Sequence, residues 1–199
     1  MPSLRLETVT GAAAIAPLLP ALSRLRIAVF RDWPYLYDGD AAQEAAYLGH
    51  FLAGPDTAIV LARDAGGEPV GCATCIPAAQ SDEAVQAALA RGGLDPARCC
   101  YLGESVLLPA HRGQGIGVGF FAAREAHARS LGLAAAAFAA VVRNPNDPRR
   151  PPDQVPLDGF WRRRGYAPRP ELSFVMPWRE VGDDRETPHS LGLWVKDAL

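Results

Sequence analysis

The chain has 199 residues, a length that fits one domain, and its formal net charge at pH 7 is −2. Hydrophobic residues make up 49% and charged residues 21% of the sequence, so an ordinary globular core is expected. The slightly acidic balance argues against binding nucleic acid by neutralising its phosphates. No apolar run reaches the roughly 18–20 residues of a membrane span, and the N-terminal residues lack the features of a secretory signal. We therefore expect a cytoplasmic protein without nucleic-acid or membrane partners.

The first part of the chain predicts a strand and two helices. Residues 4–10 alternate apolar and polar side chains, which is typical of a half-buried strand. A leucine-rich stripe at helical spacing then predicts a helix that begins near Pro17 and stops at 32–34. Asp40 and a glutamine three residues later form a capping box, so we expect a second helix from there to Gly54.

The middle of the chain predicts a hairpin, an insertion and a long strand. Residues 57–63 and 69–77 are β-branched and apolar runs on either side of a glycine-rich turn, which favours a hairpin. A short alanine-rich helix that begins near Ser81 belongs to an insertion at 79–99. The next strand is expected at 100–108.

The last third predicts two strands, a short helix and a long loop. We expect a strand at 134–142, a helix at 157–164 and a last strand at 172–178. Residues 143–156 contain five prolines, and a loop of this length is usually functional or mobile.

The four cysteines are interpreted as reduced and buried. Cys72 and Cys75 form a C-x-x-C inside the strand predicted at 69–77, while Cys99 and Cys100 are adjacent. Residues three apart on a strand face opposite sides, so this pair is poorly placed to chelate zinc. We expect no metal site.

The stretch 104–119 is the most informative part of the sequence. An apolar strand is followed by Pro109, a glycine-rich turn and the start of a helix that runs to about Ser130. The glycines occupy alternate positions, at Gly113, Gly115, Gly117 and Gly119. Backbone N–H groups left uncovered at a helix N-terminus bind anions, which predicts a site for a phosphorylated cofactor. A tight strand-to-helix connection without a ligand is the other interpretation.

Three phosphate-binding patterns compete for this stretch. The dinucleotide fingerprint needs a glycine at its sixth position and fails because Val118 or Phe120 stands there, counted from Gly113 or Gly115. The Walker A pattern fails because the stretch has no lysine. The pattern Arg/Gln-x-x-Gly-x-Gly/Ala after a strand is satisfied at every position by Arg112-Gly113-Gln114-Gly115-Ile116-Gly117. This motif, with the strand and proline before it, resembles the acetyl-CoA pyrophosphate loop of the GNAT superfamily of acyl-CoA N-acyltransferases.

The resemblance extends over residues 4–178 and implies a fold that the pattern of elements leaves open. From the pattern alone we expect an α/β or α+β domain. The resemblance implies a single mixed, mostly antiparallel sheet flanked by helices and splayed between its fourth and fifth strands, with acetyl-CoA in the splay. We assign residues 1–180 to this GNAT-like domain and 181–199 to a C-terminal tail, which packs either on the domain or on a partner, such as a second copy in a homodimer.

The resemblance also assigns residues to the cofactor. By motif position these are Ser105, Val106, Leu107, Arg112, Gly113, Gln114, Gly115, Ile116, Gly117 and Asn144. The amides of residues 113–117 are expected to hold the pyrophosphate, and Arg112 to frame the turn. The backbone of 105–107 is expected to meet the pantetheine and acetyl group, with the Leu107 N–H polarising the thioester carbonyl. Asn144 is expected either beside the pantetheine arm or in a local turn before Pro145.

Acetyl transfer to an amine requires a group that takes the proton of the ammonium. Glu104, three residues before Leu107 on the same strand, is the candidate base, and an ion pair at a strand edge is its alternative role. The family often places a tyrosine where this chain has Trp161, so the general acid is open. Tyr166 is the candidate for that role, a buried hydrogen-bonded tyrosine is the alternative, and water is a third donor.

The acceptor site is expected in the loop between the first two helices. Family members line this site with that loop, and here it carries Tyr35 and Tyr37 together with Asp38 and Asp40. Tyrosines and carboxylates suit a cationic amine, including one with an apolar or aromatic part. A solvated loop with its tyrosines anchored in the core is the alternative.

The resemblance therefore implies an acetyl-CoA-dependent N-acetyltransferase. We expect direct attack by the amine in a ternary complex, with acetyl-CoA as the co-substrate, no metal and no covalent acyl-enzyme. The acceptor is a small-molecule or peptide amine. Two other functions stay open: a GNAT-fold module that binds acyl-CoA without turnover, and an enzyme that binds a nucleotide in the same turn.

Overall fold

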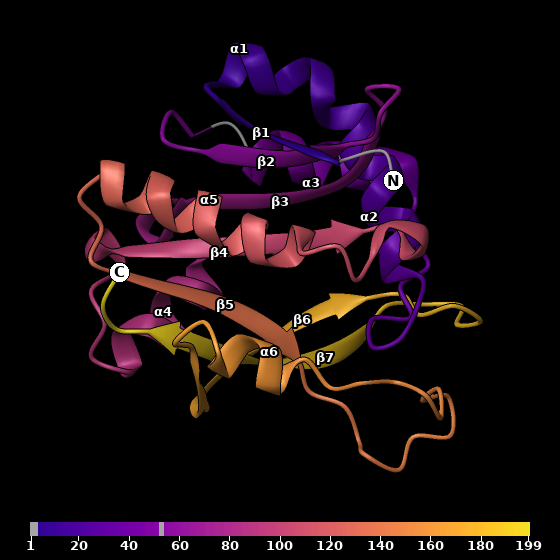
Figure 1. Cartoon of the computed structure of the whole chain (residues 1–199). Coiled ribbons are helices and arrows are strands. Elements are labelled where there is room, and N and C mark those ends of the chain that lie inside the picture. Colours follow the sequence, from indigo (N-terminus) through magenta and orange to yellow (C-terminus); the bar gives the residue numbers. More distant parts are fainter. Residues whose placement is uncertain (1–3, 52–53) are drawn as a thin grey trace.

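The strands of the protein form one mixed sheet whose two faces are covered by helices (Figure 1). The computed structural model describes residues 4–51 and 54–199. Within these residues the sheet has seven strands in the order β1-β2-β3-β4-β5-β7-β6. They are β1 Arg5–Thr10, β2 Ala58–Arg63, β3 Pro69–Pro77, β4 Cys99–Leu107, β5 Ala135–Val141, β6 Ala167–Trp178 and β7 Thr187–Lys196.

The helices lie where the sequence predicts them except α1, which precedes the helix start expected near Pro17, and short 3-10 turns stand between them. The α-helices are α1 Ala12–Ile15, α2 Leu19–Phe30, α3 Ala41–Phe51, α4 Glu83–Arg91, α5 Ile116–Ser130 and α6 Asp158–Arg162. The 3-10 turns are η1 Ala16–Leu18, η2 Ala78–Gln80, η3 Pro96–Arg98 and η4 Pro109–His111. The predicted cap of α3 is confirmed, because Asp40 Oδ1 accepts the N–H groups of Ala42 and Gln43 at 2.9 and 3.1 Å.

Successive residues of the central strands point to opposite faces of the sheet, so the core has two halves, one on each face. On β2, Ile59 and Leu61 pack on the α2 side, whereas Val60 and Ala62 pack on the α5 side. This follows from the two-residue period of a strand that is covered on both faces. The cysteines follow the same rule: Cys72 and Cys75 belong to different halves, and all four thiols are free and buried, as predicted.

The predicted splay between β4 and β5 is confirmed. These two strands run parallel and pair over three positions only, from Cys99↔Ala135 to Tyr101↔Ala137. Both strands continue, β4 to Leu107 and β5 to Val141, without further pairing between them. The other neighbouring strands in the described sheet are antiparallel. A wedge therefore opens between the C-terminal ends of β4 and β5.

One helical stretch is longer and more apolar than we expected from the sequence. Residues 12–30 form 19 consecutive helical residues with a mean hydropathy of 1.5, which meets the length and composition of a membrane span. A core helix of a globular protein passes the same test, and here one face carries Leu22 and Leu25 into the core with both side chains almost fully buried. Arg26 on this helix forms ion pairs with acidic residues of α3 and β4.

The segment assigned from sequence to a C-terminal tail is part of the sheet. Residues 187–196 form β7, which lies between β5 and β6 and pairs with both. Leu191, Leu193 and Val195 point into the main core, and Trp194 points into the opposite half. The boundary at residue 180 is therefore wrong for the fold, since β6 reaches the sheet only through β7. The alternation of these apolar residues was the signal for a strand.

We predict that β7 is required for the stability of the whole domain. Val195→Ala on β7 should lower the free energy of unfolding by about 2 kcal/mol, because the Val195 side chain is 1% exposed. Val175→Ala on the neighbouring β6 is the matched control: this side chain is 56% exposed, and a surface substitution usually changes stability by less than about 0.5 kcal/mol. Urea denaturation of the two variants measures the difference. Equal losses, or a fully stable chain truncated after Gly182, would show that β7 is a dispensable tail.

Candidate active site

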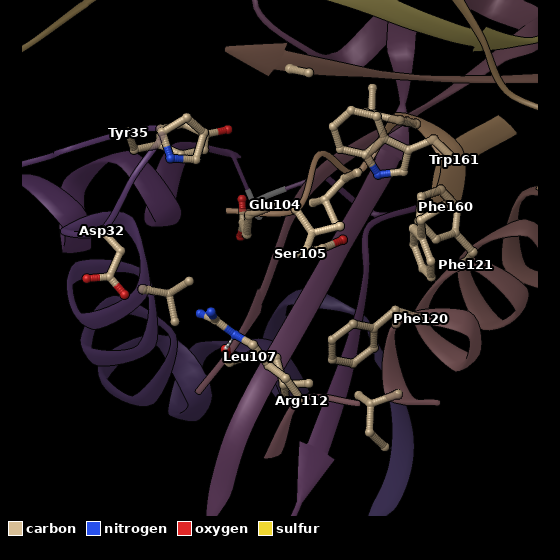
Figure 2. Close-up of a pocket in the computed structure, with 18 of the residues that line it drawn as sticks. Asp32, Tyr35, Glu104, Ser105, Leu107, Arg112, Phe120, Phe121, Phe160 and Trp161 are labelled. Atoms are coloured by element: carbon tan, nitrogen blue, oxygen red, sulfur yellow. Dashed lines mark hydrogen bonds between the residues drawn. The ribbon is translucent and has the colours of Figure 1, made fainter. Parts of the chain in front are cut away.

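The wedge between β4 and β5 holds a cavity of about 1090 Å³ (Figure 2). Its walls include residues from the diverging parts of both strands, namely Glu104, Ser105, Leu107, Phe138, Ala139 and Ala140. The first turns of α5 and the start of α6 close one side, and the segment 32–35 closes another. The cavity is in the size range of sites that enclose small molecules.

The glycine-rich turn forms an anion-binding nest at one end of this cavity. Gly113 and Gly115 have φ of 77° and 81°, a left-handed conformation that glycine adopts without strain. Within the described ranges, none of the amides of residues 113–117 donates a hydrogen bond, whereas Val118 and Gly119 donate to the Gly115 carbonyl. Five successive N–H groups are thus available at the N-terminus of a 15-residue helix.

The N–H and carbonyl groups of Leu107, at the end of β4, lie on the side of the strand that faces the wedge. Gly71 on β3 lies opposite Leu107, and the next residue, Leu108, donates its N–H to the Val70 carbonyl at 3.0 Å. Successive N–H groups of an antiparallel strand point alternately toward and away from the partner, so the Leu107 N–H points away from β3 into the wedge. The Leu107 carbonyl accepts Arg112 Nε at 3.0 Å, which ties the glycine turn to the end of β4.

Glu104 lies at a β-bulge in β4 and is almost sealed from solvent. The register with β3 shifts between Ala73↔Ser105 and Cys75↔Leu102, so β4 carries one extra residue there. The Glu104 side chain is 2% exposed, and its Oε2 accepts Arg26 Nη1 at 2.8 Å. Its other oxygen, Oε1, is buried and has no hydrogen-bond partner among the residues that the structure describes. A buried carboxylate oxygen without a partner is costly, and Glu104 lines the cavity.

Arg26 is a site residue that the sequence analysis missed. Its Nε donates to Glu44 Oε2 at 2.5 Å while its Nη1 binds Glu104. The guanidinium also lies 5.0 Å from the ring centroid of Phe30 and 4.7 Å from that of Tyr47. Burial opposes the charge of Arg26, but the two carboxylates outweigh it and raise the pKa of Arg26. A charged residue on the apolar stripe of a helix, one turn after Leu22, was the available signal.

Arg124 is the second residue that the sequence analysis missed. It lies on α5, is 1% exposed, and no carboxylate in the described part of the chain pairs with it. Its Nη1 donates to the carbonyls of Thr74 and Glu104, both at 3.4 Å, and its Nε donates to the Phe120 carbonyl at 3.2 Å. Burial lowers the pKa of Arg124. These carbonyls flank the bulge, so Arg124 fixes the backbone that carries Glu104.

Tyr166, expected as the general acid, lies outside the cavity. Its ring is buried among the aromatic residues between α5 and β5, including Phe121 and Phe138. The hydroxyl donates to Glu125 Oε1 at 3.1 Å, and burial together with Glu125 raises the pKa of Tyr166. The structure therefore gives Tyr166 the alternative role, that of a buried, hydrogen-bonded tyrosine. Phe160 and Trp161 line the cavity where the family often has a tyrosine.

Asn144 and Val106 also lie apart from the cavity wall. Asn144 Oδ1 accepts the N–H of Asn146 at 2.9 Å, which is the local turn named as its alternative, and the residue lines a second cavity of about 590 Å³. The Val106 side chain is fully buried, while its neighbours Ser105 and Leu107 line the main cavity. Of the glycine turn, Gly113, Gly115, Ile116 and Gly117 line the cavity and Gln114 does not.

The structure separates the two tyrosines that we expected at the acceptor site. Tyr35 lines the cavity, and its carbonyl accepts Trp178 Nε1 at 3.1 Å. Tyr37 packs against the main core, and its backbone pairs with that of Glu180. Burial raises the pKa of each tyrosine to about 12, so both hydroxyls are neutral at physiological pH.

The carboxylates that we expected beside these tyrosines are engaged elsewhere. Asp38 forms ion pairs with Arg31 and Arg179 at 2.9 and 3.1 Å, and Asp40 caps α3. Neither lines the cavity, whereas Asp32 and Asp153 do. In the described part of the chain, no group of three or more His, Cys, Asp or Glu side chains is arranged to hold a metal ion.

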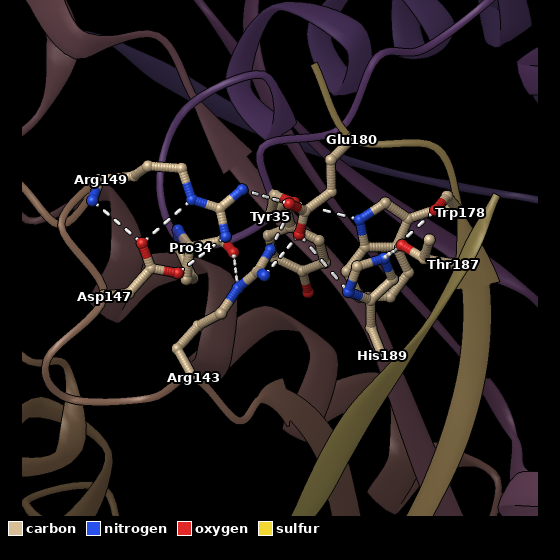
Figure 3. Close-up of polar contacts among 9 residues, drawn as sticks. All are labelled: Pro34, Tyr35, Arg143, Asp147, Arg149, Trp178, Glu180, Thr187 and His189. Atoms are coloured by element: carbon tan, nitrogen blue, oxygen red, sulfur yellow. Dashed lines mark hydrogen bonds and ion pairs between the residues drawn. The ribbon is translucent and has the colours of Figure 1, made fainter. Parts of the chain in front are cut away.

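An ion-pair network around the buried Glu180 fastens the proline-rich loop to the segment 32–35 (Figure 3). Glu180, 5% exposed, binds the guanidinium groups of both Arg143 and Arg149. Burial opposes the ionised form of Glu180, but the two arginines lower its pKa. Arg143 also donates to the carbonyls of Pro34 and Tyr35 at 2.6 and 2.8 Å. The proline-rich loop that follows β5 is thereby fastened to the segment that carries Tyr35.

Comparison with known proteins identifies the family. A family model described as the acetyltransferase (GNAT) family matches residues 22–151, which include most of α2 and the whole of β4, the glycine turn and α5. The chain belongs to the GNAT acetyltransferase family. As a GNAT protein it is an acyltransferase, as the glycine turn led us to expect. No curated protein matches its sequence.

Solved structures share the GNAT fold of this chain at low sequence identity. A GCN5-related N-acetyltransferase from Kribbella flavida is 17% identical with a TM-score of 0.56, and the match covers 96% of this chain and 97% of that one. A ribosomal-protein-alanine N-acetyltransferase from Brucella melitensis is 15% identical, with a TM-score of 0.61 and 98% and 99% coverage. PaiA N-acetyltransferase from Thermoplasma acidophilum, in complex with coenzyme A, is 11% identical, with a TM-score of 0.57 and 98% and 99% coverage.

We predict that Arg124 stabilises the bulge. Arg124→Met should lower the free energy of unfolding by about 2 kcal/mol or more, because it leaves the Thr74 and Glu104 carbonyls without a donor. Arg129→Met on the same helix is the control, since Arg129 is 49% exposed and only 3.8 Å from Glu125. A surface pair of this kind contributes about 0–1 kcal/mol. Chemical denaturation compares the two variants, and equal effects would remove Arg124 from this role.

Proposed function

We propose that the protein is an N-acetyltransferase that transfers an acetyl group from acetyl-CoA to an amine by direct attack in a ternary complex. One observation carries the proposal: the nest of five available amides and the unpaired Oε1 of Glu104 belong to one cavity. The first feature suits a phosphate and the second suits an ammonium, so a single cavity meets both reactants. The GNAT family supports this assignment.

The residues present fit the cofactor end of the cavity. The amides of residues 113–117 would hold the pyrophosphate, with the Arg112 guanidinium beside them. The likeness in fold to a GNAT protein solved with coenzyme A supports this choice of cofactor. When bound, acetyl-CoA supplies an acyl group activated as a thioester.

The Leu107 N–H and the Glu104 carboxylate have complementary roles in the proposed transfer. The Leu107 N–H, directed into the wedge, would donate to the acyl oxygen as negative charge develops there. Glu104 Oε1 would accept the proton of the acceptor ammonium, directly or through water. The new C–N bond forms as the C–S bond breaks, and the electron pair leaves with sulfur. The second proton that the nitrogen loses on becoming an amide passes through water to the thiolate, because Tyr166 is committed to Glu125.

We predict that acetyl-CoA binding depends on the nest. Gly115→Glu should weaken acetyl-CoA binding at least 30-fold in calorimetric titration, because it places a negative charge and a strained backbone at the phosphate site. Gly93→Glu is the matched control. Gly93 has φ of 73° and open space around it, in the turn after α4, so the variant carries the same charge and a similar strain away from the cavity. If both variants bind acetyl-CoA like the wild type, the nest is only a connection.

We predict opposite outcomes for the two candidate catalytic residues. Glu104→Gln should lower kcat by about 10²- to 10⁴-fold below pH 8 with little change in acetyl-CoA affinity, since it removes the proton acceptor. The defect should shrink as the pH rises, because more of the acceptor amine is then neutral. Tyr166→Phe should change kcat less than about threefold, since the ring lies outside the cavity. Release of free thiol measures both, and a pH-independent loss in Glu104→Gln would indicate a purely structural role.

A further inference from the structure

The main cavity is lined by charged groups of both signs. Its cationic residues, Arg112, Arg124 and Arg164, come from the glycine turn, α5 and the end of α6. Its other carboxylates besides Glu104 are Asp32 and Asp153, which come from the segment after α2 and from the proline-rich loop. Figure 2 shows Asp32 and Tyr35 facing the aromatic side chains of α5 and α6, with Glu104 between the two walls. The wall with Asp32 and Tyr35 is called the acceptor wall below.

The proline-rich loop belongs to the acceptor wall. Arg143 at its start donates to the carbonyls of Pro34 and Tyr35, and Arg149 within it binds the same Glu180 as Arg143. Residues of this loop and of 33–34 also line the second cavity together. The loop that carries Asp153 is thus fastened to the segment that carries Asp32.

The arginines around the acceptor wall are already neutralised by carboxylates of the chain. Arg26 is shared by Glu44 and Glu104, and Arg31 is paired with Asp38. Arg143 and Arg149 share Glu180, and Asp147 binds Arg149 as well. Arg150 binds Gln154 and lines the second cavity instead. In the described part of the chain, Arg26, Arg31, Arg143 and Arg149 are thus each paired with a carboxylate, and Arg150, which has only Gln154, lines the second cavity and not the main one.

The two carboxylates of the acceptor wall are in the opposite situation. Neither Asp32 nor Asp153 forms a side-chain hydrogen bond or ion pair with any residue in the ranges 4–51 and 54–199. Apolar side chains stand beside them: Trp33 and Tyr35 on one segment, and Val155, 77% exposed, on the other. An exposed apolar side chain in a cavity wall is a contact site for an apolar group, and aromatic faces attract cations.

We propose that the acceptor is an amine with an apolar or aromatic body and a second cationic group. The reacting nitrogen meets Glu104 Oε1, which is buried and unpaired, the body lies against Trp33, Tyr35 and Val155, and the second cation faces Asp32 and Asp153. An acceptor that carries a carboxylate in place of the second cation is rejected by the same charges. This substrate class rests on the proposed acetyl transfer.

Three amines of one shape test the proposal. Benzylamine has no second charge, 4-(aminomethyl)benzylamine has a second ammonium, and 4-(aminomethyl)benzoate has a carboxylate at the same place. We expect kcat/KM to be about tenfold higher for the diamine than for benzylamine, after division by two for its equivalent nitrogens, and at least tenfold lower for the benzoate. Equal values for the three compounds, or the reverse order, would overturn the proposal.

Substitutions in the acceptor wall test which carboxylates provide the preference. Asp32→Asn and Asp153→Asn should each lower the diamine-to-benzylamine ratio about threefold, and the double variant about tenfold, with the effect reduced at high salt. Glu83→Gln is the control, because it removes the same charge from an exposed position on α4 outside the cavity. An unchanged ratio in the double variant would contradict the role of these residues.

Binding measurements separate this proposal from the proposed function. Titration of the three amines into protein saturated with CoA reports the charge preference without turnover. Tightest binding of the diamine with no acetylation of any amine would support the acceptor class and contradict acetyl transfer. Acetylation of all three amines without a charge order would support acetyl transfer and contradict the acceptor class.

Discussion

The early end of pairing between β4 and β5 is the constraint on which the rest of this structure depends. Two parallel strands that stayed paired to their ends would leave no room between them, but here the ladder stops at Tyr101↔Ala137. The bulge at Glu104 adds a residue to β4 where the strands part, and the buried Arg124 supplies donors for carbonyls on both sides of it. The wedge thus exposes backbone N–H groups, among them that of Leu107, to a cavity instead of to a neighbouring strand.

Buried charge is concentrated beside this wedge and is only partly compensated. Arg26 joins Glu44 and Glu104 across α2, α3 and β4, so one cation meets two carboxylates. Removing such groups from water is costly unless each polar atom finds a partner. In this triad the polar side-chain atoms are paired with one another except Glu104 Oε1, which is buried without a donor among the described residues, in a side chain that lines the cavity. The unmet hydrogen bond stands at the point where the proposed chemistry needs a proton acceptor, and Arg26 holds the carboxylate in place.

The acceptor wall is assembled from segments that are distant in the sequence. The segment 32–35 and the proline-rich loop meet at Glu180, two residues after the end of β6, through the guanidinium groups of Arg143 and Arg149. A long loop is entropically expensive to order, and charge-assisted hydrogen bonds in a buried setting offset that cost. Because Arg143 and Arg149 are paired with Glu180, their positive charges are compensated within the chain. The same contacts that position the wall therefore leave Asp32 and Asp153 to determine which acceptor it receives.

The sequence by itself determined the features that depend on residues close together in the chain. The strand and helix periods, the Asp40 cap, the burial of the cysteines and the glycine turn were predictable, because each follows from local geometry and spacing. The splay between β4 and β5 was predicted only from the resemblance to a family. Tertiary structure alone decided that residues 187–196 form an inner strand, that Tyr166 binds Glu125, and that Arg26 meets a glutamate 78 residues away. Burial, hydrogen-bond partners and charge balance are properties of neighbours in space, and these neighbours are set by strand order and helix packing, which a local pattern does not encode.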